Sequence, residues 1–457
     1  MVRRRGRIDE RSAKRGLPMT PVSLTLSFLA LMFVMMALRV PIAISMFVAG
    51  SVGYVMQAGW SPYASFMNTM TFARFASYDL SVIPLFILMG QFATQGGISK
   101  ALFAFTAGIM GRFKGGLAMA AVLASAAFGA ICGSSVATAA TITGVALPEM
   151  KRHGYSGRLA TGTLATAGTL GILIPPSVPL VIYAILTEQN IAKLFLAATI
   201  PGIIAMLGYM AVIFIYVRLV PGHAPAVDKN PPALTWASLV GVAPIGVVFV
   251  LVFGGIYGGF FSPTEGAAVG SAAAFVAATL KGEMTWAKFK QCFYATAQSS
   301  AMIFVIFIGA DIMNSALALT QIQHQLVNII HGWNVAPIWV MVAIVALHIV
   351  LGTVTEELSI ILLTIPIFFP VVMGLDFGMP KESVAIWFGI MILMVVSFGM
   401  LVPPMGLNVY VVNGMAKDVP LTESFRGVLP FLISDLFRIL LLLFVPGVCL
   451  WLLRFMR

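Results

Sequence analysis

The sequence predicts an all-α polytopic membrane protein made of two inverted repeats, each with a re-entrant helical hairpin and a transmembrane helix broken at a Pro-Pro pair. The first observation is composition: of 457 residues, 60% are hydrophobic and 9% are charged, whereas soluble proteins are about 25% charged. The second is a repeated motif, GILIPP at 171–176 and GMLVPP at 399–404. A double proline interrupts a helix, and paired breaks in two repeats indicate a transporter binding site. The alternative is a packing kink in each helix.

The net charge of +11 is carried by basic residues scattered in short loops between apolar runs. This is the positive-inside pattern of membrane proteins, and it argues against nucleic-acid binding. The three cysteines stand alone, without the paired spacing of disulfides or metal sites. The sequence has neither a phosphate-binding P-loop nor an HExxH motif. We therefore expect no ATP-driven transport, no enzyme and no cofactor.

The chain begins with a predicted basic tail over residues 1–20, since seven of the first 18 residues are Arg or Lys. A disordered tail, or an extension upstream of a start at Met19, is favoured over an anchor to lipid headgroups. The predicted first half covers 21–217. Its apolar stretch 117–150 has Gly-Ser-Ser at its midpoint and basic residues on both flanks. If both flanks are cytoplasmic, the chain must enter and return, which predicts a re-entrant hairpin over 115–150.

A helix over 159–186, broken at the first Pro-Pro, completes the predicted first half. The polar loop 218–235 then separates it from the second half, 236–457, where we expect a hairpin over 335–373 and a broken helix over 384–412. Gly90 and Gly133 recur as Gly309 and Gly352 at the same offset. The flanks of the second hairpin carry little net charge, which favours entry from the opposite side of the membrane.

Polar residues gather at both predicted hairpin tips. Hydroxyls and unwound carbonyls suit a small alkali cation, while helix N-termini favour a substrate carboxylate. The tips therefore predict a sodium-coupled carrier of organic anions, and the alternative is interhelical packing by Ser and Thr. The first tip offers Gly133, Ser134, Ser135 and Thr138, and the second offers Gly352, Thr353, Thr355 and Glu356. Substrate contacts are predicted at Gly133, Pro176, Ser177 and Asn408.

Isolated acids inside apolar segments are costly, so they need an explanation. At least one of Glu356 and Glu357 should have a functional partner, unless both lie in a water-filled vestibule. Two roles remain open for Asp311: an ion relay and a structural hydrogen bond. Asp435 and Arg438 are three apart on a predicted helix and should pair with each other.

Several long motifs occur in an order that resembles the large membrane subunit of tripartite ATP-independent periplasmic (TRAP) transporters, in the ion-transporter superfamily. They are IPLFILMG at 83–90, GSSVATAATITGVALPEM at 133–150, GILIPPS at 171–177, LFLAATIPGII at 194–204, TIPIFFPVV at 364–372 and VPPMGLNVYVV at 402–412. The resemblance implies sodium-driven uptake of organic acids by an elevator mechanism in a bacterial inner membrane. It also implies two partners, a small four-helix membrane subunit and a soluble periplasmic binding protein.

The resemblance further implies two cation sites. The first comprises Ser134, Ser135, Thr138, Gly171 and Pro175, and its inverted counterpart comprises Thr353, Thr355, Glu356, Gly399 and Pro403. Three residues depart from the family pattern: Cys132 stands where Ser is usual, Glu356 where Asp is usual, and Val402 where Thr often precedes the Pro-Pro. Two of the three affect the second site.

Two other functions are compatible with parts of this pattern. A self-sufficient sodium/carboxylate symporter of the same superfamily would need no binding protein. An intramembrane enzyme would need a catalytic dyad at mid-depth, and no paired Asp or Ser/Lys signature is present in the sequence. The identity of the substrate is not readable, because in a tripartite transporter the binding protein would select it.

Overall fold

The computed structural model describes residues 20–225, 236–332 and 335–455. Within these ranges the regular structure is helical throughout, without strands, as the sequence predicts. The predicted basic tail, except for Thr20, lies outside the described residues. So does the segment 226–235 of the predicted loop between the halves.

Eleven α-helices precede the loop between the halves. They are α1 (Pro21–Ala37), α2 (Ile42–Ala58), α3 (Trp60–Phe75), α4 (Val82–Gln95), α5 (Ile98–Met110), α6 (Gly116–Cys132), α7 (Ser135–Arg152), α8 (Gly157–Gly168), α9 (Leu170–Leu173), α10 (Val178–Thr187) and α11 (Ile191–Leu219). A short 3-10 helix, Tyr78–Ser81, precedes α4.

The remaining described residues form a second series of helices. They are α12 (Trp236–Tyr257), α13 (Pro263–Leu280), α14 (Trp286–Thr320), α15 (Ile322–Gly332), α16 (Pro337–Gly352), α17 (Glu357–Gly374), α18 (Lys381–Gly399), α19 (Leu407–Met415), α20 (Leu421–Phe444) and α21 (Gly447–Leu450), with a closing 3-10 helix Trp451–Phe455.

Among the described residues, seven helices are long and apolar enough to cross a membrane. An eighth span results if α3 and the segment Tyr78–Gln95, which are bent by 57°, are taken together. A helix of about 20 apolar residues matches the hydrocarbon core of a bilayer. The protein is therefore a multi-pass membrane protein.

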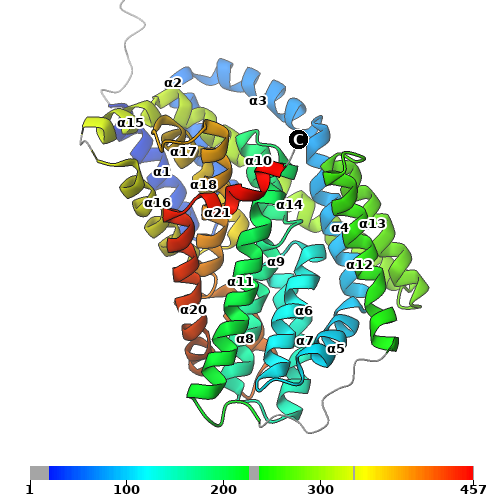
Figure 1. Ribbon diagram of the computed structural model, residues 1–457. Helices are drawn as coiled ribbons and strands as arrows, with labels where there is room; N and C mark the ends of the chain where they lie inside the picture. The colour runs from blue at the N-terminus through cyan, green and yellow to red at the C-terminus, as the bar shows by residue number, and fades with distance from the viewer. Residues whose placement is uncertain (1–19, 226–235, 333–334, 456–457) are drawn as a thin grey trace, which may run out of the picture.

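The two broken helices lie inside the molecule. In Gly157–Thr187 and in Lys381–Gly399, 83% of the apolar window is buried by the protein, compared with 33% in α11 and α12. The first broken helix rises from α8 low in the view, through α9, to α10 near the top (Figure 1). Unwound backbone at membrane depth is tolerated only where protein or a polar cavity surrounds it. This burial accounts for how the chain accommodates the Pro-Pro breaks.

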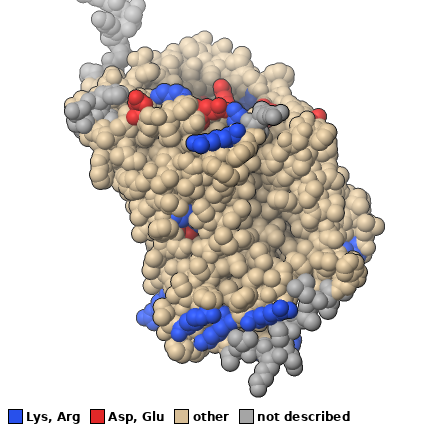
Figure 2. Space-filling view, viewed as in Figure 1, with Lys and Arg blue, Asp and Glu red and all other residues tan. Residues whose placement is uncertain are grey.

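The two ends of the molecule differ in charge. Figure 2 shows Lys and Arg in a row along the lower end, whereas acidic and basic residues mix at the upper end. The lower end contains ion pairs that join α7 and α8 to the α19–α20 region: Lys151 with Asp418, and Arg158 with Glu423 at 2.7 Å. Cytoplasmic loops of membrane proteins carry an excess of Lys and Arg, and the row of basic residues at the lower end has this character.

Two isolated acids have partners in the structure. Asp435 and Arg438 of α20 form the predicted pair, with 2.8 Å between Oδ1 and a guanidinium nitrogen. Asp311 of α14 receives both its charged hydrogen bonds from Arg74 of α3, including one from Nε at 2.6 Å. The ion pair with Arg74 therefore supports a structural role for Asp311 rather than a role as an ion relay.

Candidate transport site

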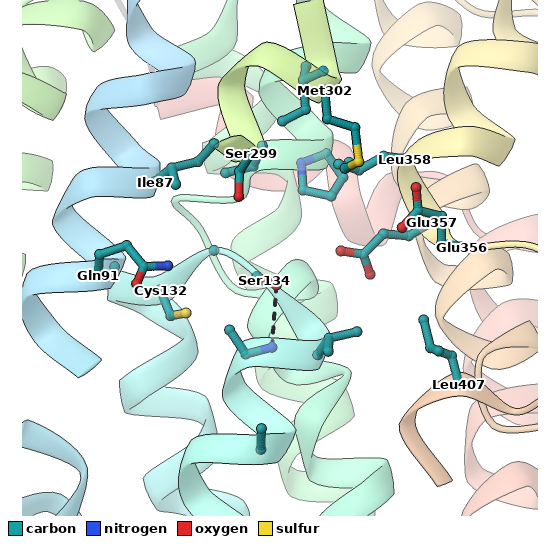
Figure 3. Close-up of a pocket in the computed structure, with 18 of the residues that line it drawn as sticks. Ile87, Gln91, Cys132, Ser134, Ser299, Met302, Glu356, Glu357, Leu358 and Leu407 are labelled. Atoms are coloured by element: carbon teal, nitrogen blue, oxygen red, sulfur yellow. Dashed lines mark hydrogen bonds between the residues drawn. The ribbon is translucent and has the colours of Figure 1, made fainter. Parts of the chain in front are cut away.

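A cavity of about 410 Å³ lies where the tips of the two helix pairs α6–α7 and α16–α17 approach each other. Its walls come from both halves of the chain. Figure 3 shows Ile87 and Gln91 on α4, Ser299 and Met302 on α14, and Glu356 and Glu357 opposite Cys132 and Ser134. The lining is mostly apolar with a few polar groups, which is the usual character of a small-molecule site.

The first tip is a two-residue connection that turns the chain from α6 into α7. Gly133 ends α6 in the left-handed region at φ +65°, where a side chain would be strained. Its carbonyl accepts a hydrogen bond from the N–H of Val178 at 3.3 Å, which holds the tip against the first Pro-Pro break. Ser134 caps α7, because its hydroxyl oxygen accepts from the N–H of Ala137 at 3.4 Å. The positive end of the α7 dipole therefore lies at the cavity.

Behind this tip lies a buried cluster of oxygens, which we call the first oxygen cluster: the hydroxyls of Ser135 and Thr138, the Ser134 carbonyl and the Asn408 side-chain carbonyl. The Asn408 amide donates to the Ser135 hydroxyl at 2.6 Å and to the Ala165 carbonyl at 3.2 Å. Among the described residues, Thr138 Oγ1 and Asn408 Oδ1 are buried without a hydrogen-bond partner. Orphaned buried acceptors of this kind are rare, and each needs an explanation.

Gly171 closes this cluster from the side of α9. A Cβ at this position would lie 2.4 Å from Thr138 Oγ1 and 2.5 Å from the Ser134 carbonyl oxygen. Such a contact is too short for any side chain. Gly171 therefore lets the backbone of the first broken helix approach the hydroxyl and carbonyl oxygens of the first tip.

The second tip has a related arrangement. The Thr353 carbonyl accepts from the N–H of Met405, directly after the second Pro-Pro, at 3.1 Å. The backbones of Gly352 and Gly399 are in contact, since a Cβ on Gly399 would lie 2.5 Å from the Gly352 Cα. The hydroxyls of Thr353 and Thr355 donate to carbonyls of the α16 end at 2.8 and 3.0 Å. Each hydroxyl oxygen thus keeps acceptor capacity.

Two adjacent carboxylates enter the cavity from the start of α17. Glu356 Oε1 accepts a hydrogen bond from the Ser359 hydroxyl at 3.1 Å. Glu357 is 7% exposed, and its Oε2 has no hydrogen-bond partner among the described residues. Its carboxylate faces the backbone N–H of Ser135 at the first tip.

The structure separates the predicted site residues into two groups. Gly133, Ser134 and Glu356 line the cavity. The other predicted residues do not line it: Ser135, Thr138, Gly171, Pro175, Pro176, Ser177, Thr353, Thr355, Gly399, Pro403 and Asn408. Ser177 caps α10 through a long contact to the Leu180 N–H at 3.5 Å.

Sequence reasoning missed the cavity wall that α4 and α14 supply. Gln91, Ser299 and Met302 line it. Gln91 is a polar residue in an otherwise apolar run, which is a signal that could have identified it. Ser299 and Met302 carry no such signal, because only packing brings α14 to this cavity.

Comparison with known proteins assigns the chain to a family. The sequence model of the tripartite ATP-independent periplasmic transporter, DctM component, matches residues 29–448. The chain belongs to this TRAP transporter family. It is a transporter permease rather than an enzyme, and the resemblance noted in its motifs is confirmed.

The chain is similar to several large permeases. It is 34% identical over 381 residues to the C4-dicarboxylate TRAP transporter large permease protein DctM of Pseudomonas aeruginosa, covering 82% of this chain and 86% of that protein. It is 30% identical over 452 residues to the protein of the same name in Vibrio cholerae, covering 93% and 97%. The sialic acid TRAP transporter large permease protein SiaM of Vibrio cholerae is 30% identical over 376 residues, covering 81% and 84%.

A solved structure shares the fold. The Alcanivorax borkumensis YdaH transporter superposes with a TM-score of 0.64 at 14% identity, covering 93% of this chain and 98% of that one. At this identity the likeness concerns the fold alone.

Proposed function

We propose that this TRAP permease is the large subunit of a sodium-coupled secondary transporter, which imports an organic acid delivered by a periplasmic binding protein across a bacterial inner membrane. The observation that carries the proposal is the cavity between the two tips. The N-terminus of an 18-residue helix, α7, opens onto this cavity, and the first oxygen cluster lies directly behind that helix start. A helix N-terminus attracts a carboxylate, and oxygen donors suit sodium.

The first oxygen cluster supports a sodium site. Its donors are hydroxyl, carbonyl and amide oxygens, which are hard ligands without the soft nitrogen or sulfur that transition metals prefer. The unpartnered Thr138 Oγ1 and Asn408 Oδ1 are ready acceptors for a cation. Ser134, Ser135, Thr138, Gly171 and Pro175 would form this site, with Asn408 holding Ser135 in place.

The second proposed sodium site lies at the other tip, with Thr353, Thr355, Glu356, Gly399 and Pro403. The close backbone contact of Gly352 with Gly399 and the free acceptor capacity of both Thr hydroxyls support it. The Glu356 carboxylate would supply the negative charge. A charge at membrane depth costs about 2.5–3.5 kcal/mol on insertion scales, and a bound cation would offset it.

We also propose that the repeats are inverted and that transport uses an elevator motion. In Figure 1 the α6–α7 pair occupies the lower half and the α16–α17 pair the upper half, which supports entry from opposite sides. The hairpins and broken helices would move together as one body. α4 and α14, which supply one wall of the cavity, would belong to the body that stays fixed.

A small four-helix membrane subunit and a periplasmic binding protein are the proposed partners. The isethionate TRAP transporter permease protein DctMQ of Oleidesulfovibrio alaskensis supports the first partner, because this chain covers only 66% of its length. The remaining third is long enough for a small membrane subunit fused to the permease.

The test is uptake by vesicles that contain the reconstituted complex, screened over organic acids with and without a sodium gradient and without ATP. We expect uptake only with inward sodium and with the binding protein present. Uptake that persists in sodium-free medium would contradict the sodium coupling. Equal uptake by the permease alone would favour a self-sufficient symporter.

A further inference from the structure

Among the described residues, Glu357 is the one carboxylate lining the cavity that the proposed cation sites leave unused. It lies in the first turn of α17, it is more than nine-tenths buried, and its Oε2 has no hydrogen-bond partner among the described residues. Its neighbour Glu356 differs, because it accepts a hydrogen bond from the Ser359 hydroxyl and belongs to the proposed second cation site. A buried carboxylate oxygen that is left without a hydrogen-bond donor is costly, so the free Oε2 of Glu357 points to a ligand.

Among the described residues that line the cavity, none is a basic side chain that would neutralise this carboxylate. The lining residues in the described chain include Glu356 and Glu357 but no Lys, Arg or His. Arg74 is engaged with Asp311 elsewhere. A substrate with two carboxylates would therefore find attraction at the α7 N-terminus and repulsion at Glu357.

The cavity has a positive group, the N-terminus of α7, and a negative group, the Glu357 carboxylate, and the two lie close together. The Glu357 carboxylate faces the Ser135 N–H, in the first turn of α7, and the Ser134 hydroxyl beside it lines the cavity. Figure 3 shows the two glutamates on one side and Ser134 on the other, with Leu358 and Met302 above. A ligand that binds both the start of α7 and Glu357 must carry opposite charges a few atoms apart.

We propose that the cavity recognises a zwitterionic organic acid, in which a positively charged nitrogen is close to the carboxylate, as in an amino acid. The substrate carboxylate binds at the Ser134 hydroxyl, beside the Ser135 N–H that faces Glu357, and the ammonium group pairs with the free Oε2 of Glu357. The apolar remainder packs against Ile87, Met302 and Leu358. This inference rests on the proposed function, because it names the class of organic acid that the same site takes.

The experiment compares probes that differ only in the charged nitrogen. Purified full-length permease in sodium chloride is titrated with L-valine against 3-methyl-2-oxobutanoate, and with L-glutamate against 2-oxoglutarate, with succinate as a dianion. Thermal stabilisation reports binding. In at least one pair, the amino acid should stabilise the permease at a concentration about tenfold or more below the concentration of its oxo acid that gives the same effect. The reason is that the oxo acid leaves Glu357 unpaired.

Glu357→Gln keeps the shape of the side chain and removes its charge. We expect it to abolish the preference for the amino acid, because the ammonium group loses its partner while the oxo acid binds as well as in wild type or better. Glu149→Gln, on the exposed C-terminal end of α7, is the matched control and should keep the preference. If Glu357→Gln does not fold, Glu357→Asp should reduce the preference.

Three results would overturn the inference: no response to either amino acid, equal or better binding of the oxo acid in both pairs, or a preference that survives Glu357→Gln. Sodium-dependent binding of an oxo acid alone would contradict the zwitterion while leaving the proposed function intact. Loss of sodium-driven uptake in the vesicle experiment would instead contradict the proposed function.

Discussion

The side-chain amide of Asn408 donates a hydrogen bond to the hydroxyl of Ser135 at 2.6 Å, although 273 positions separate the two residues in the chain. Asn408 follows the second Pro-Pro break, and Ser135 begins the second helix of the first hairpin. This contact ties the two halves together directly behind the cavity. It makes Asn408 a positioning residue for the first tip.

Asn408→Ala should raise the sodium concentration for half-maximal uptake, because Ser135 loses the group that orients it. A lost buried hydrogen-bond partner costs about 1–3 kcal/mol, so we also expect a lower melting temperature. Asn413→Ala is the control, since Asn413 lies on the same helix and bonds to Val419 and Ser424 instead. A normal sodium dependence in Asn408→Ala would show that the contact only stabilises the fold.

Thr138→Val tests whether an orphaned hydroxyl binds sodium. Val has the same shape, and Thr138 Oγ1 makes no protein hydrogen bond among the described residues, so thermal stability should be unchanged or higher. If the hydroxyl is a sodium ligand, the half-maximal sodium concentration should rise roughly tenfold, because a contact to a charged group is worth about 1.5–3 kcal/mol.

Thr163→Val is the matched control for that change. Thr163 Oγ1, on α8, is also buried and unpartnered, but it lies outside the proposed sodium sites. Its replacement should leave the sodium dependence unmoved. Equal effects of the two variants would mean that Thr138 has only a packing role.

Gly171→Ala should abolish sodium-dependent uptake, because the new Cβ would contact Thr138 Oγ1 and the Ser134 carbonyl at 2.4 and 2.5 Å. Overpacking of this kind typically costs about 1–3 kcal/mol. Gly246→Ala, on α12, has nothing within 4 Å of the new Cβ and should behave as wild type. Uptake should be compared at matched membrane abundance. Wild-type sodium dependence in Gly171→Ala would argue against a site there.

Single cysteines at the two hairpin bases test the inverted topology. The natural cysteines, Cys132, Cys292 and Cys449, are buried and should label poorly. Arg152 and Asp376 are exposed, so cysteines at these positions should react with a membrane-impermeant reagent. We expect Arg152→Cys to label from the cytoplasmic side and Asp376→Cys from the periplasmic side. Labelling of both from one side would contradict the inverted arrangement.

The ion pair of Asp418 with Lys151 should survive mild acid. The hydrogen bond from Lys151 holds the pKa of Asp418 below its usual value. Stability from a lowered pKa is present above the unfolded pKa, about 3.9, and is lost only as the pH falls through the folded pKa. The melting-temperature difference between wild type and Asp418→Asn should therefore stay constant from pH 7 to pH 5. A difference that disappears in this range would contradict the lowered pKa of Asp418, and the absence of any difference at pH 7 would show that the pair adds no stability.

Local features of the sequence determined the membrane class, the helical fold and the residues at the tips. Long apolar runs must span a bilayer as helices, and Pro-Pro must interrupt them, wherever those segments pack. Ser134 could also be predicted at a helix start, because its role as a cap depends on neighbours three residues away. The pair of Asp435 with Arg438 was predictable for the same reason.

Only the tertiary structure decided which distant groups meet. Asn408 turned out to hold Ser135, Asp311 to bind Arg74, and Gln91 and Ser299 to line the cavity. Glu357 was visible as a costly acid, but its position opposite the first tip was not. Such contacts depend on how whole helices pack, and membrane helices pack through small residues and shape that leave little periodic signal in the sequence.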